Sequence, residues 1–303
     1  MVCDVLIIGA GPAGLTAGIY AARGCLKTII VEKGAVGGQA VTTWEIENYP
    51  GAPENTTGPS LTERMRAQAE SFGCEFVTGT YKGMMREEGM YSVTIGKEVY
   101  QTKTVIIAAG ATPRALGCKG EAEHKGMGVS YCATCDANFY RNLDVVVVGG
   151  GDTAVEEALY LTKFAKKVII IHRRDRFRAV QLLEDRAKAH PQIDIIWDSV
   201  VEEIFGKPVV TGVKVRNVKT NEVTDLATDG VFVFVGQQPG SEPFAVDVAC
   251  DEKGYILTDE NMATNLPGVF AAGDIRPKSL RQVVTATADG AIAAMSAMKY
   301  IEK

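Results

Sequence analysis

VLIIGAGPAG, residues 5–14, has the same pattern of apolar residues and spaced glycines as VVVVGGGDTA, residues 145–154, which lies 140 residues later. Each copy begins with four consecutive apolar residues, which is typical of a parallel strand buried on both faces. A glycine-rich turn follows, and then a run of small residues that predicts a helix. After each predicted helix comes a second, largely apolar run, at residues 28–31 and 168–171. The sequence therefore predicts two strand–helix–strand units related by an internal repeat.

Each glycine-rich turn has the spacing of a dinucleotide-binding loop. One glycine allows the tight turn, a second lets the backbone approach a pyrophosphate, and a small sixth residue lets the helix pack on the strand. One such loop is weak evidence, but two in the same context predict an α/β protein with two Rossmann-like three-layer domains. The expected loop residues are Gly9, Gly11, Pro12, Ala13 and Gly14 in the first domain and Gly149, Gly151, Asp152, Thr153 and Ala154 in the second.

The residue at the end of the second strand of each unit distinguishes the two ligands. Glu32 lies 18 residues after Gly14, where an acid can hold the ribose hydroxyls of an adenine nucleotide that lacks a 2′-phosphate. Guanidinium groups instead bind a 2′-phosphate through charge-assisted hydrogen bonds. The matching position of the second unit is basic, which predicts an NADPH site, with a solvated basic loop as the alternative. The basic residues are His172, Arg173, Arg174 and Arg178.

Three further apolar runs that end at glycine indicate how the domains are connected. Residues 105–110 and 231–236 match each other, and each is followed by a proline three residues on, so each closes its domain. The third run, 268–273, must then belong to a domain that began earlier. We expect the chain to leave the first domain near residue 113 and to return near residue 244. The first nucleotide-binding domain is thus expected to be discontinuous, residues 1–113 and 245–303, around a second nucleotide-binding domain of residues 114–244.

Composition points to a soluble cytoplasmic protein. The 303 residues are 46% hydrophobic and 23% charged, as in ordinary globular proteins, and the net charge of -5 argues against a nucleic-acid partner. We expect no targeting segment and no membrane span, because no basic leader and no apolar run of 18 residues is present. Five of the seven cysteines are scattered singly, which is typical of a reducing compartment.

The other two cysteines form the motif Cys132-Ala133-Thr134-Cys135, which Asp136 follows directly. Two thiols two residues apart can close a small disulfide ring and carry two electrons. The alternatives are half of a zinc site, which would need four ligands, and two inert buried thiols. A reactive thiol needs a proton acceptor to form its thiolate, and Asp136 is placed for that role. Asp136 could also cap a following turn, and the two roles are compatible. The motif therefore predicts a redox dithiol and no metal.

A dithiol that lies between two nucleotide sites needs a relay for its electrons. A nicotinamide delivers a hydride and does not readily hand it to a disulfide, whereas a flavin accepts a hydride and passes electrons to a disulfide. FAD is therefore the expected cofactor of the first domain, and NADPH that of the second.

With these motifs the chain resembles the low-molecular-weight bacterial thioredoxin reductases from residue 9 to residue 294. The resemblance also rests on Gly37-Gly38-Gln39, on Glu47-Asn48-Tyr49-Pro50-Gly51, and on the pairs Gly273-Asp274 and Arg281-Gln282. It implies that Gly37, Gly38, Gln39 and Asn48 line the isoalloxazine of FAD. It further implies that Asp274, next to Gly273, binds the ribityl chain and that Arg281 and Gln282 close over the flavin.

The resemblance also implies unequal roles for the dithiol residues. Cys135 would face the flavin, Cys132 would attack the disulfide of thioredoxin, and Asp136 would be the general acid/base. The protein would be a homodimer, and one domain would rotate against the other between the two half-reactions.

The destination of the electrons stays open in the sequence. Met127 stands where the family commonly has an arginine, and Asn138 where it often has an aromatic residue, and both positions flank the dithiol. The partner could therefore be thioredoxin or another small disulfide protein, such as a glutaredoxin-like or peroxide-reducing one. A flavin disulfide oxidase, which would not need the arginines, and a non-enzymatic redox sensor are further alternatives.

Overall fold

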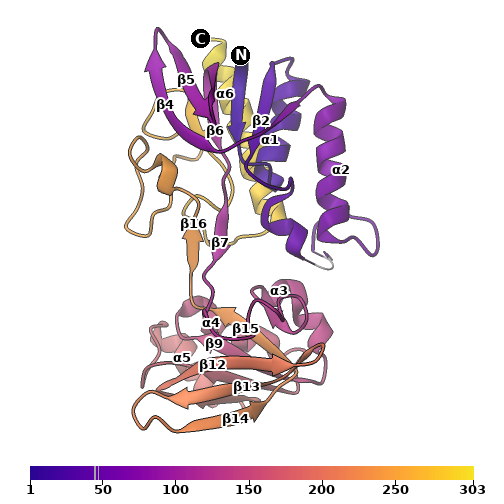
Figure 1. Ribbon diagram of the computed structural model, residues 1–303, viewed down its shortest axis with the longest axis vertical. Coiled ribbons are helices and arrows are strands. Elements are labelled where there is room, and N and C mark those ends of the chain that lie inside the picture. The colour runs from indigo at the N-terminus through magenta and orange to yellow at the C-terminus, as the bar shows by residue number, and fades with distance from the viewer. Residues whose placement is uncertain (44–45, 47) are drawn as a thin grey trace. The chain divides into compact units, whose positions relative to one another are not determined.

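The computed structural model describes residues 1–43, 46 and 48–303, and the chain divides into two compact units. The first unit contains Met1–Thr112 and Gln238–Lys303, and the second contains Pro113–Gln237. Each unit has its own sheet and its own helices (Figure 1). The expected α/β architecture with two Rossmann-like units is confirmed.

The first unit is built on a sheet with the strand order β3-β2-β1-β6-β5-β4, in which β17 also pairs with β6. The strands β2 and β6 run parallel to the central strand β1, whereas β4 and β5 are antiparallel to their neighbours. The strands span Val2–Ile8 (β1), Thr28–Glu32 (β2), Glu75–Thr78 (β3), Tyr81–Glu87 (β4), Met90–Ile95 (β5), Glu98–Ile107 (β6) and Val269–Ala271 (β17).

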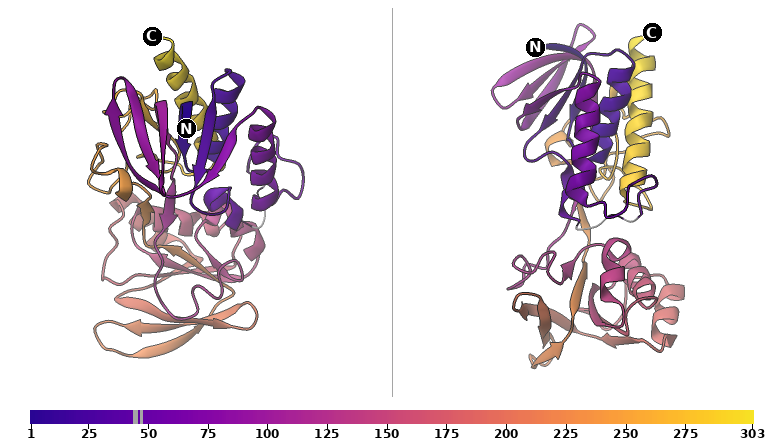
Figure 2. Two further views of the ribbon diagram at one scale, coloured as in Figure 1. Left: turned by 45° about the horizontal axis from the view of Figure 1, so that its top comes forward. Right: turned by 90° about the vertical axis from the view of Figure 1, so that its right-hand side faces the viewer.

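Three helices cover one face of this sheet (Figure 2): α1 (Pro12–Arg23), α2 (Gly58–Ser71) and α6 (Val283–Ile301). The side chains of β1 alternate, so that Val5 and Ile7 pack with the helices while their neighbours pack on the other face. The helices α1 and α6 approach closely, because Gly290 has no side chain. A Cβ there would lie 2.2 Å from the carbonyl oxygen of Ala13.

The second unit is a three-layer sandwich around the parallel sheet β11-β10-β9-β15-β8. Helices pack with Val145 and Val147 on one face, and an antiparallel sheet packs with Val146 and Val148 on the other. The parallel strands span Val129–Ser130 (β8), Asp144–Gly149 (β9), Lys167–Ile171 (β10), Ile193–Ile196 (β11) and Gly230–Phe234 (β15). The other elements are Ala133–Asp136 (α3), Asp152–Leu161 (α4), Gln181–Ala189 (α5), Ser199–Gly206 (β12), Val210–Asn217 (β13) and Val223–Ala227 (β14).

Two short strands carry the chain between the units. They are β7 (Ala111–Pro113) and β16 (Gln237–Pro239), which pair with each other as a two-stranded sheet. The sequence placed the return crossing near residue 244, whereas the contacts place it between residues 237 and 238.

Tertiary contacts draw the residues after β16 into the first unit. The backbone N–H of Gly240 donates a hydrogen bond to the carbonyl oxygen of Gly110 at 2.9 Å. Phe244 is 2% exposed, and its ring stacks on that of Tyr81 with 4.4 Å between the centroids. A sequence segment rich in turn residues gives no sign of these contacts, so its position in the first unit emerges only from the fold.

Among the described residues, no helix is both long and apolar enough to span a membrane.

Candidate functional site

The two cysteines of the motif form a disulfide at the start of α3. Their sulfur atoms are 2.14 Å apart and their Cα atoms 5.3 Å apart. Cys132 has an extended backbone and precedes the helix, and the single helical turn brings Cys135 back to it. Ala133, between them, is fully buried and packs with the core under α4. The expected Cys132–Cys135 pair is therefore present and is held on the body of the second unit.

Asp136 is held beside the disulfide by a residue that sequence reasoning missed. The hydroxyl of Ser130 donates a hydrogen bond to Oδ2 of Asp136 at 2.6 Å, and the hydroxyl oxygen of Ser130 accepts the N–H of Cys132 at 3.1 Å. Burial raises the pKa of Asp136, and the bond from Ser130 opposes that rise. The Asp136 side chain does not cap the following turn, so the capping alternative is wrong. A carboxyl group of raised pKa can hold and release a proton near the thiols.

The segment that leads into the dithiol is fastened by the buried carboxylate of Glu121. One carboxylate oxygen accepts the N–H of Leu116 and the hydroxyl of Tyr131, and the other accepts the N–H of Gly117, each at 2.8 Å. Glu121 is 4% exposed, so these three bonds satisfy a group that would otherwise be costly to bury. It thereby ties residues just after β7 to the neighbour of Cys132. No local pattern in the sequence signals this role.

The first glycine loop has the shape that its sequence predicts. A Cβ at Gly9 would lie 2.4 Å from the carbonyl oxygen of Ala108, and a Cβ at Gly14 would lie 1.9 Å from that of Gly9. The backbone itself therefore excludes side chains at these two positions. A Cβ at Gly11, the residue before α1, would have no atom closer than 3.7 Å, so this position leaves room for a ligand at the helix N-terminus.

Glu32 lies at the end of β2, beside the first glycine loop. Its Oε2 accepts the N–H of Ala10 at 2.8 Å, and its Oε1 accepts the N–H of Gly34 at 3.1 Å. The N–H of Gly37 donates to the carbonyl oxygen of Ala10 at 2.8 Å. The structure therefore brings Glu32 and the Gly37-Gly38-Gln39 segment to the same loop.

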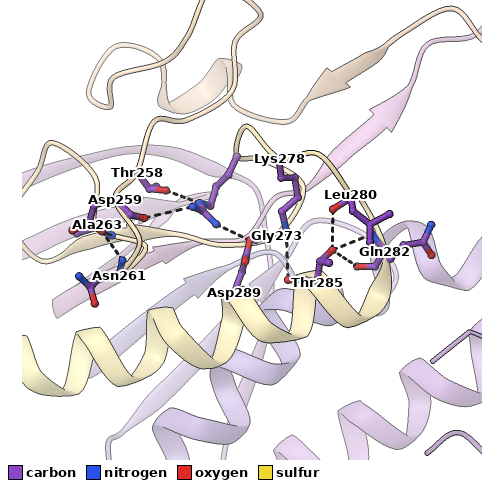
Figure 3. Close-up of polar contacts among 11 residues, drawn as sticks. Thr258, Asp259, Asn261, Ala263, Gly273, Lys278, Leu280, Gln282, Thr285 and Asp289 are labelled. Carbon is purple, nitrogen blue, oxygen red and sulfur yellow. Dashed lines mark hydrogen bonds and ion pairs between the residues drawn. The ribbon is translucent and has the colours of Figure 1, made fainter. Parts of the chain in front are cut away.

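Asn48 and Gln282, which lie 234 positions apart in the sequence, also meet. The Nδ2 of Asn48 donates to Oε1 of Gln282 at 3.1 Å. Gln282 precedes α6, and its backbone N–H donates to Oγ1 of Thr285 at 3.2 Å (Figure 3). Glu47, the first residue of the motif around Asn48, lies outside the described residues.

Asp274 and Arg281 have buried polar atoms that suit a ligand. Within the described part of the chain, Oδ1 of Asp274 and Nε of Arg281 have no hydrogen-bond partner. Burial raises the pKa of Asp274, while Lys278 and Arg281 oppose that rise. The guanidinium of Arg281 lies over the ring of Tyr255, 4.5 Å from its centroid. Because buried polar groups are normally paired, these atoms fit a flavin whose hydroxyl and carbonyl groups would pair them.

The second glycine loop is closed by packing at one glycine and open at another. A Cβ at Gly149 would lie 2.5 Å from the carbonyl oxygen of Phe234, whereas a Cβ at Gly151 would meet nothing within 4 Å. Gly151 precedes α4, whose first residue, Asp152, accepts the N–H of Val180 through Oδ1 at 2.8 Å. Thr153 and Ala154 follow in the first turn of the helix.

The basic segment, residues 172–178, is hydrogen-bonded to this loop and presents exposed guanidinium groups. The N–H of Arg178 donates to the carbonyl oxygen of Gly150 at 2.6 Å. Arg173, Arg174 and Arg178 are exposed, and none of them forms an ion pair among residues 1–43, 46 and 48–303. A phosphate group that binds an exposed guanidinium of this segment would therefore displace no ion pair of the described residues.

His172 lies differently from the arginines, because it is 5% exposed and packs behind the glycine loop. A Cβ at Gly150 would lie 2.2 Å from its Nδ1. Burial, followed by the nearby charge of Arg178, lowers its pKa. Its Nε2 has no hydrogen-bond partner in the described residues. The structure thus gives His172 a supporting position under the loop as well as one unsatisfied nitrogen.

Among the described residues, no group of three or more histidine, cysteine, aspartate or glutamate side chains is arranged to hold a metal ion.

Comparisons with known proteins agree with this geometry. The model of the family described as pyridine nucleotide-disulphide oxidoreductase matches residues 3–290. A thioredoxin reductase of Peptoclostridium acidaminophilum is 52% identical over 99% of this chain and 98% of its own length. One of Bacillus subtilis is 47% identical over 99% and 95%.

A crystal structure of the thioredoxin reductase from Streptococcus pyogenes superposes with a TM-score of 0.94 at 49% identity, over 99% of this chain and 98% of that one. Both the sequence matches and the structural match extend over nearly the whole chain. The chain therefore belongs to the pyridine nucleotide-disulphide oxidoreductase family and, within it, to the low-molecular-weight bacterial thioredoxin reductases.

Proposed function

We propose that this protein reduces the disulfide of thioredoxin with electrons from NADPH, which pass through FAD and the Cys132–Cys135 pair. The observation that carries the proposal is the Cys132–Cys135 disulfide beside Asp136, in the unit that also contains a glycine loop and the exposed arginines that follow β10. The relatives of the same length that are named thioredoxin reductase support it.

The first unit is the proposed site of FAD. When bound, FAD supplies a group that accepts a hydride and passes two electrons to a disulfide. The N-terminus of α1 would hold the pyrophosphate, Glu32 the ribose, and Asp274 the ribityl chain. The complete proposed set is Gly9, Gly11, Pro12, Ala13, Gly14, Glu32, Gly37, Gly38, Gln39, Asn48, Gly273, Asp274, Arg281 and Gln282.

The second unit is the proposed site of NADPH. The N-terminus of α4 would face the pyrophosphate, and the exposed guanidinium groups would bind the 2′-phosphate. The complete proposed set is Gly149, Gly151, Asp152, Thr153, Ala154, His172, Arg173, Arg174 and Arg178.

The Cys132–Cys135 dithiol would reduce the partner disulfide by thiol–disulfide exchange. Two electrons and two protons open the Cys132–Cys135 disulfide to a dithiol. The thiolate of Cys132 attacks the partner disulfide, forming a mixed disulfide and releasing one partner thiolate. Cys135 then attacks Cys132, which re-forms the ring and releases the second partner thiol. Asp136 is the proposed group that gives and takes protons at these sulfur atoms.

The residues that flank the dithiol in the sequence favour a second candidate partner, another small disulfide protein. Phe139 is 47% exposed and Met127 is 44% exposed. Asn138, where the family often has an aromatic residue, accepts a hydrogen bond from Nε of Arg141 at 2.7 Å. The amide of Asn138 therefore orients the guanidinium of Arg141, where an aromatic residue would offer a partner an apolar surface. Thioredoxin is the first candidate partner, and trapping the partner on Cys132 distinguishes it from this second one.

We further propose that the protein is a cytoplasmic homodimer and that the second unit turns about β7 and β16 between half-reactions. Light scattering of the purified protein tests the dimer. The two crossings are short and paired, which suits a hinge of a few residues.

The test uses anaerobic mixing of the purified flavoprotein with NADPH or NADH. NADPH should bleach the flavin absorbance at a far lower concentration than NADH, and no bleaching would overturn the proposal. Cys132→Ser should keep flavin reduction and lose thioredoxin turnover, and turnover that survives would overturn the cysteine roles.

Cys135→Ser should trap the partner as a mixed disulfide on Cys132. Recovery of a glutaredoxin-like or peroxide-reducing protein in place of thioredoxin would favour the second candidate.

A further inference from the structure

A single carboxylate oxygen on α6 gathers three donors from the loop that contains Asp274. Oδ2 of Asp289 accepts the N–H of Gly273 at 3.0 Å, Nη1 of Arg276 at 2.9 Å and Nζ of Lys278 at 2.7 Å (Figure 3). Asp289 is 8% exposed. Asp274 lies directly between the first two of these contacts in the sequence. Both sides of Asp274 are therefore fixed to one buried atom.

The network extends to a second loop of the same unit. Nε of Arg276 donates to Oγ1 of Thr258 at 2.5 Å, and Nη2 reaches the carbonyl oxygen of Asp259 at 3.5 Å. The Asp259 side chain in turn accepts the N–H groups of residues 261 and 263, each at 2.9 Å. Arg276 thus clamps the loop from residues 258–263 to α6 through Asp289. The loop after Gly273 has no helix or strand of its own before residue 283, so these bonds supply its order.

The network around Asp289 contains two cations and one carboxylate, and the carboxylate of Asp274 lies next to it. Two partly buried cations, Arg276 and Lys278, with side chains 13% and 11% exposed, both pair with the carboxylate of Asp289. The nearby carboxylate of Asp274 keeps one oxygen, Oδ1, without a partner in the described residues. Lys278 acts on Asp274 through its charge, and Asp289 decides where Lys278 lies. Asp289, which would not touch the flavin, thereby fixes the surroundings of Asp274, which would.

We propose that Asp289 is a positioning residue for the flavin, and that it acts by fixing Asp274 through Gly273, Arg276 and Lys278. This inference rests on the proposed binding of FAD to the first unit. It predicts that FAD affinity depends on Asp289 only while Asp274 is present. A merely structural role would instead weaken binding equally with and without Asp274.

The test is a double-mutant cycle on FAD affinity. Apo-protein is prepared for the wild type, Asp289→Asn, Asp274→Asn and the double variant, and the dissociation constant of FAD is measured by quenching of flavin fluorescence. Asp289→Asn should raise this constant at least about tenfold in the wild type and less than about threefold in the Asp274→Asn background. Equal factors in both backgrounds, or an unchanged constant for Asp289→Asn, would overturn the inference.

A matched control is Glu184→Gln in the second unit, where a buried carboxylate is also paired with a lysine, Lys188. It should lower the melting temperature and leave the FAD constant unchanged. If Asp289→Asn does not fold, Lys278→Met tests the same link, and it should raise the FAD constant while Lys278→Arg restores it. An FAD dissociation constant that is the same in Lys278→Met and in Lys278→Arg as in the wild type would also reject the inference. A wild-type protein that binds no FAD would reject the proposed function itself.

Discussion

The hydroxyl of Ser130 donates a 2.6 Å hydrogen bond to Oδ2 of Asp136 and accepts the N–H of Cys132 at 3.1 Å. Ser130 lies at the end of β8, so a rigid strand fixes the acid relative to the first cysteine. One hydroxyl oxygen thus connects the carboxylate of Asp136 with the backbone N–H of Cys132.

Replacing Ser130 by alanine should move the titration of Asp136 upward. The hydrogen bond from Ser130 stabilises the charged carboxylate and lowers its pKa, so its loss leaves burial unopposed. In the pH profile of kcat/KM for the partner disulfide, the limb that belongs to Asp136 should shift to higher pH. Asp136→Asn, as the reference, should abolish that limb. A shift of the limb to lower pH in Ser130→Ala would contradict this account.

Two adjacent glycines of the second loop should separate a packing role from a ligand role. Gly150→Ala should destabilise the second unit, because its Cβ would lie 2.2 Å from Nδ1 of the buried His172. Gly151→Ala has open space and a backbone that alanine adopts, so the melting temperature should stay within about 1 °C while NADPH binding weakens. Thermal melting and NADPH titration measure the two effects. Similar melting temperatures for both variants would refute the distinction.

Arg173 and Arg174 should discriminate NADPH from NADH. Their replacement by alanine removes charge-assisted bonds to the 2′-phosphate, each worth roughly 1.5–3 kcal/mol. The Michaelis constant for NADPH should therefore rise far more than that for NADH. Arg176→Ala, an exposed arginine of the same segment outside the expected set, is the control for general charge. Equal changes for both cofactors, or an equal effect of Arg176→Ala, would show that these arginines are not specific phosphate ligands.

Glu157 on α4 should make the stability of the second unit depend on pH. Burial, and then the charge of Glu156, raises the pKa of Glu157 from 4.5 to about 7. The folded state therefore binds a proton that the unfolded state releases, and stability should fall as pH rises from about 4.5 to about 7. The loss is on the order of 3 kcal/mol. Glu157→Gln should remove this loss, which thermal melting at pH 5 and pH 8 measures.

The exposed Glu222→Gln is the control for Glu157, because it removes the same charge from the surface of the same unit. It should leave the difference in melting temperature between pH 5 and pH 8 unchanged. If Glu157→Gln kept the wild-type difference as well, the buried carboxyl would not be its source.

The sequence alone determined the features of this protein that depend on short stretches of chain. Apolar runs that end in spaced glycines predict the two nucleotide-binding loops, because strand burial and tight turns are local requirements. The spacing of Cys132 and Cys135 predicts a ring that one helical turn closes. Glu32 and the basic segment that begins at His172 follow their glycine loops at the same sequence spacing.

Only the tertiary structure decided which distant residues meet. Three examples are the hydrogen bond between Asn48 and Gln282, the bond from Tyr131 to Glu121, and the bonds from the loop after β17 to Asp289. No spacing pattern in the sequence relates the two partners of any of these contacts. The return crossing lies before residue 238 because the following residues pack into the first unit. Such contacts are set by how helices and strands pack, and a buried charge reveals its role only once its partners surround it.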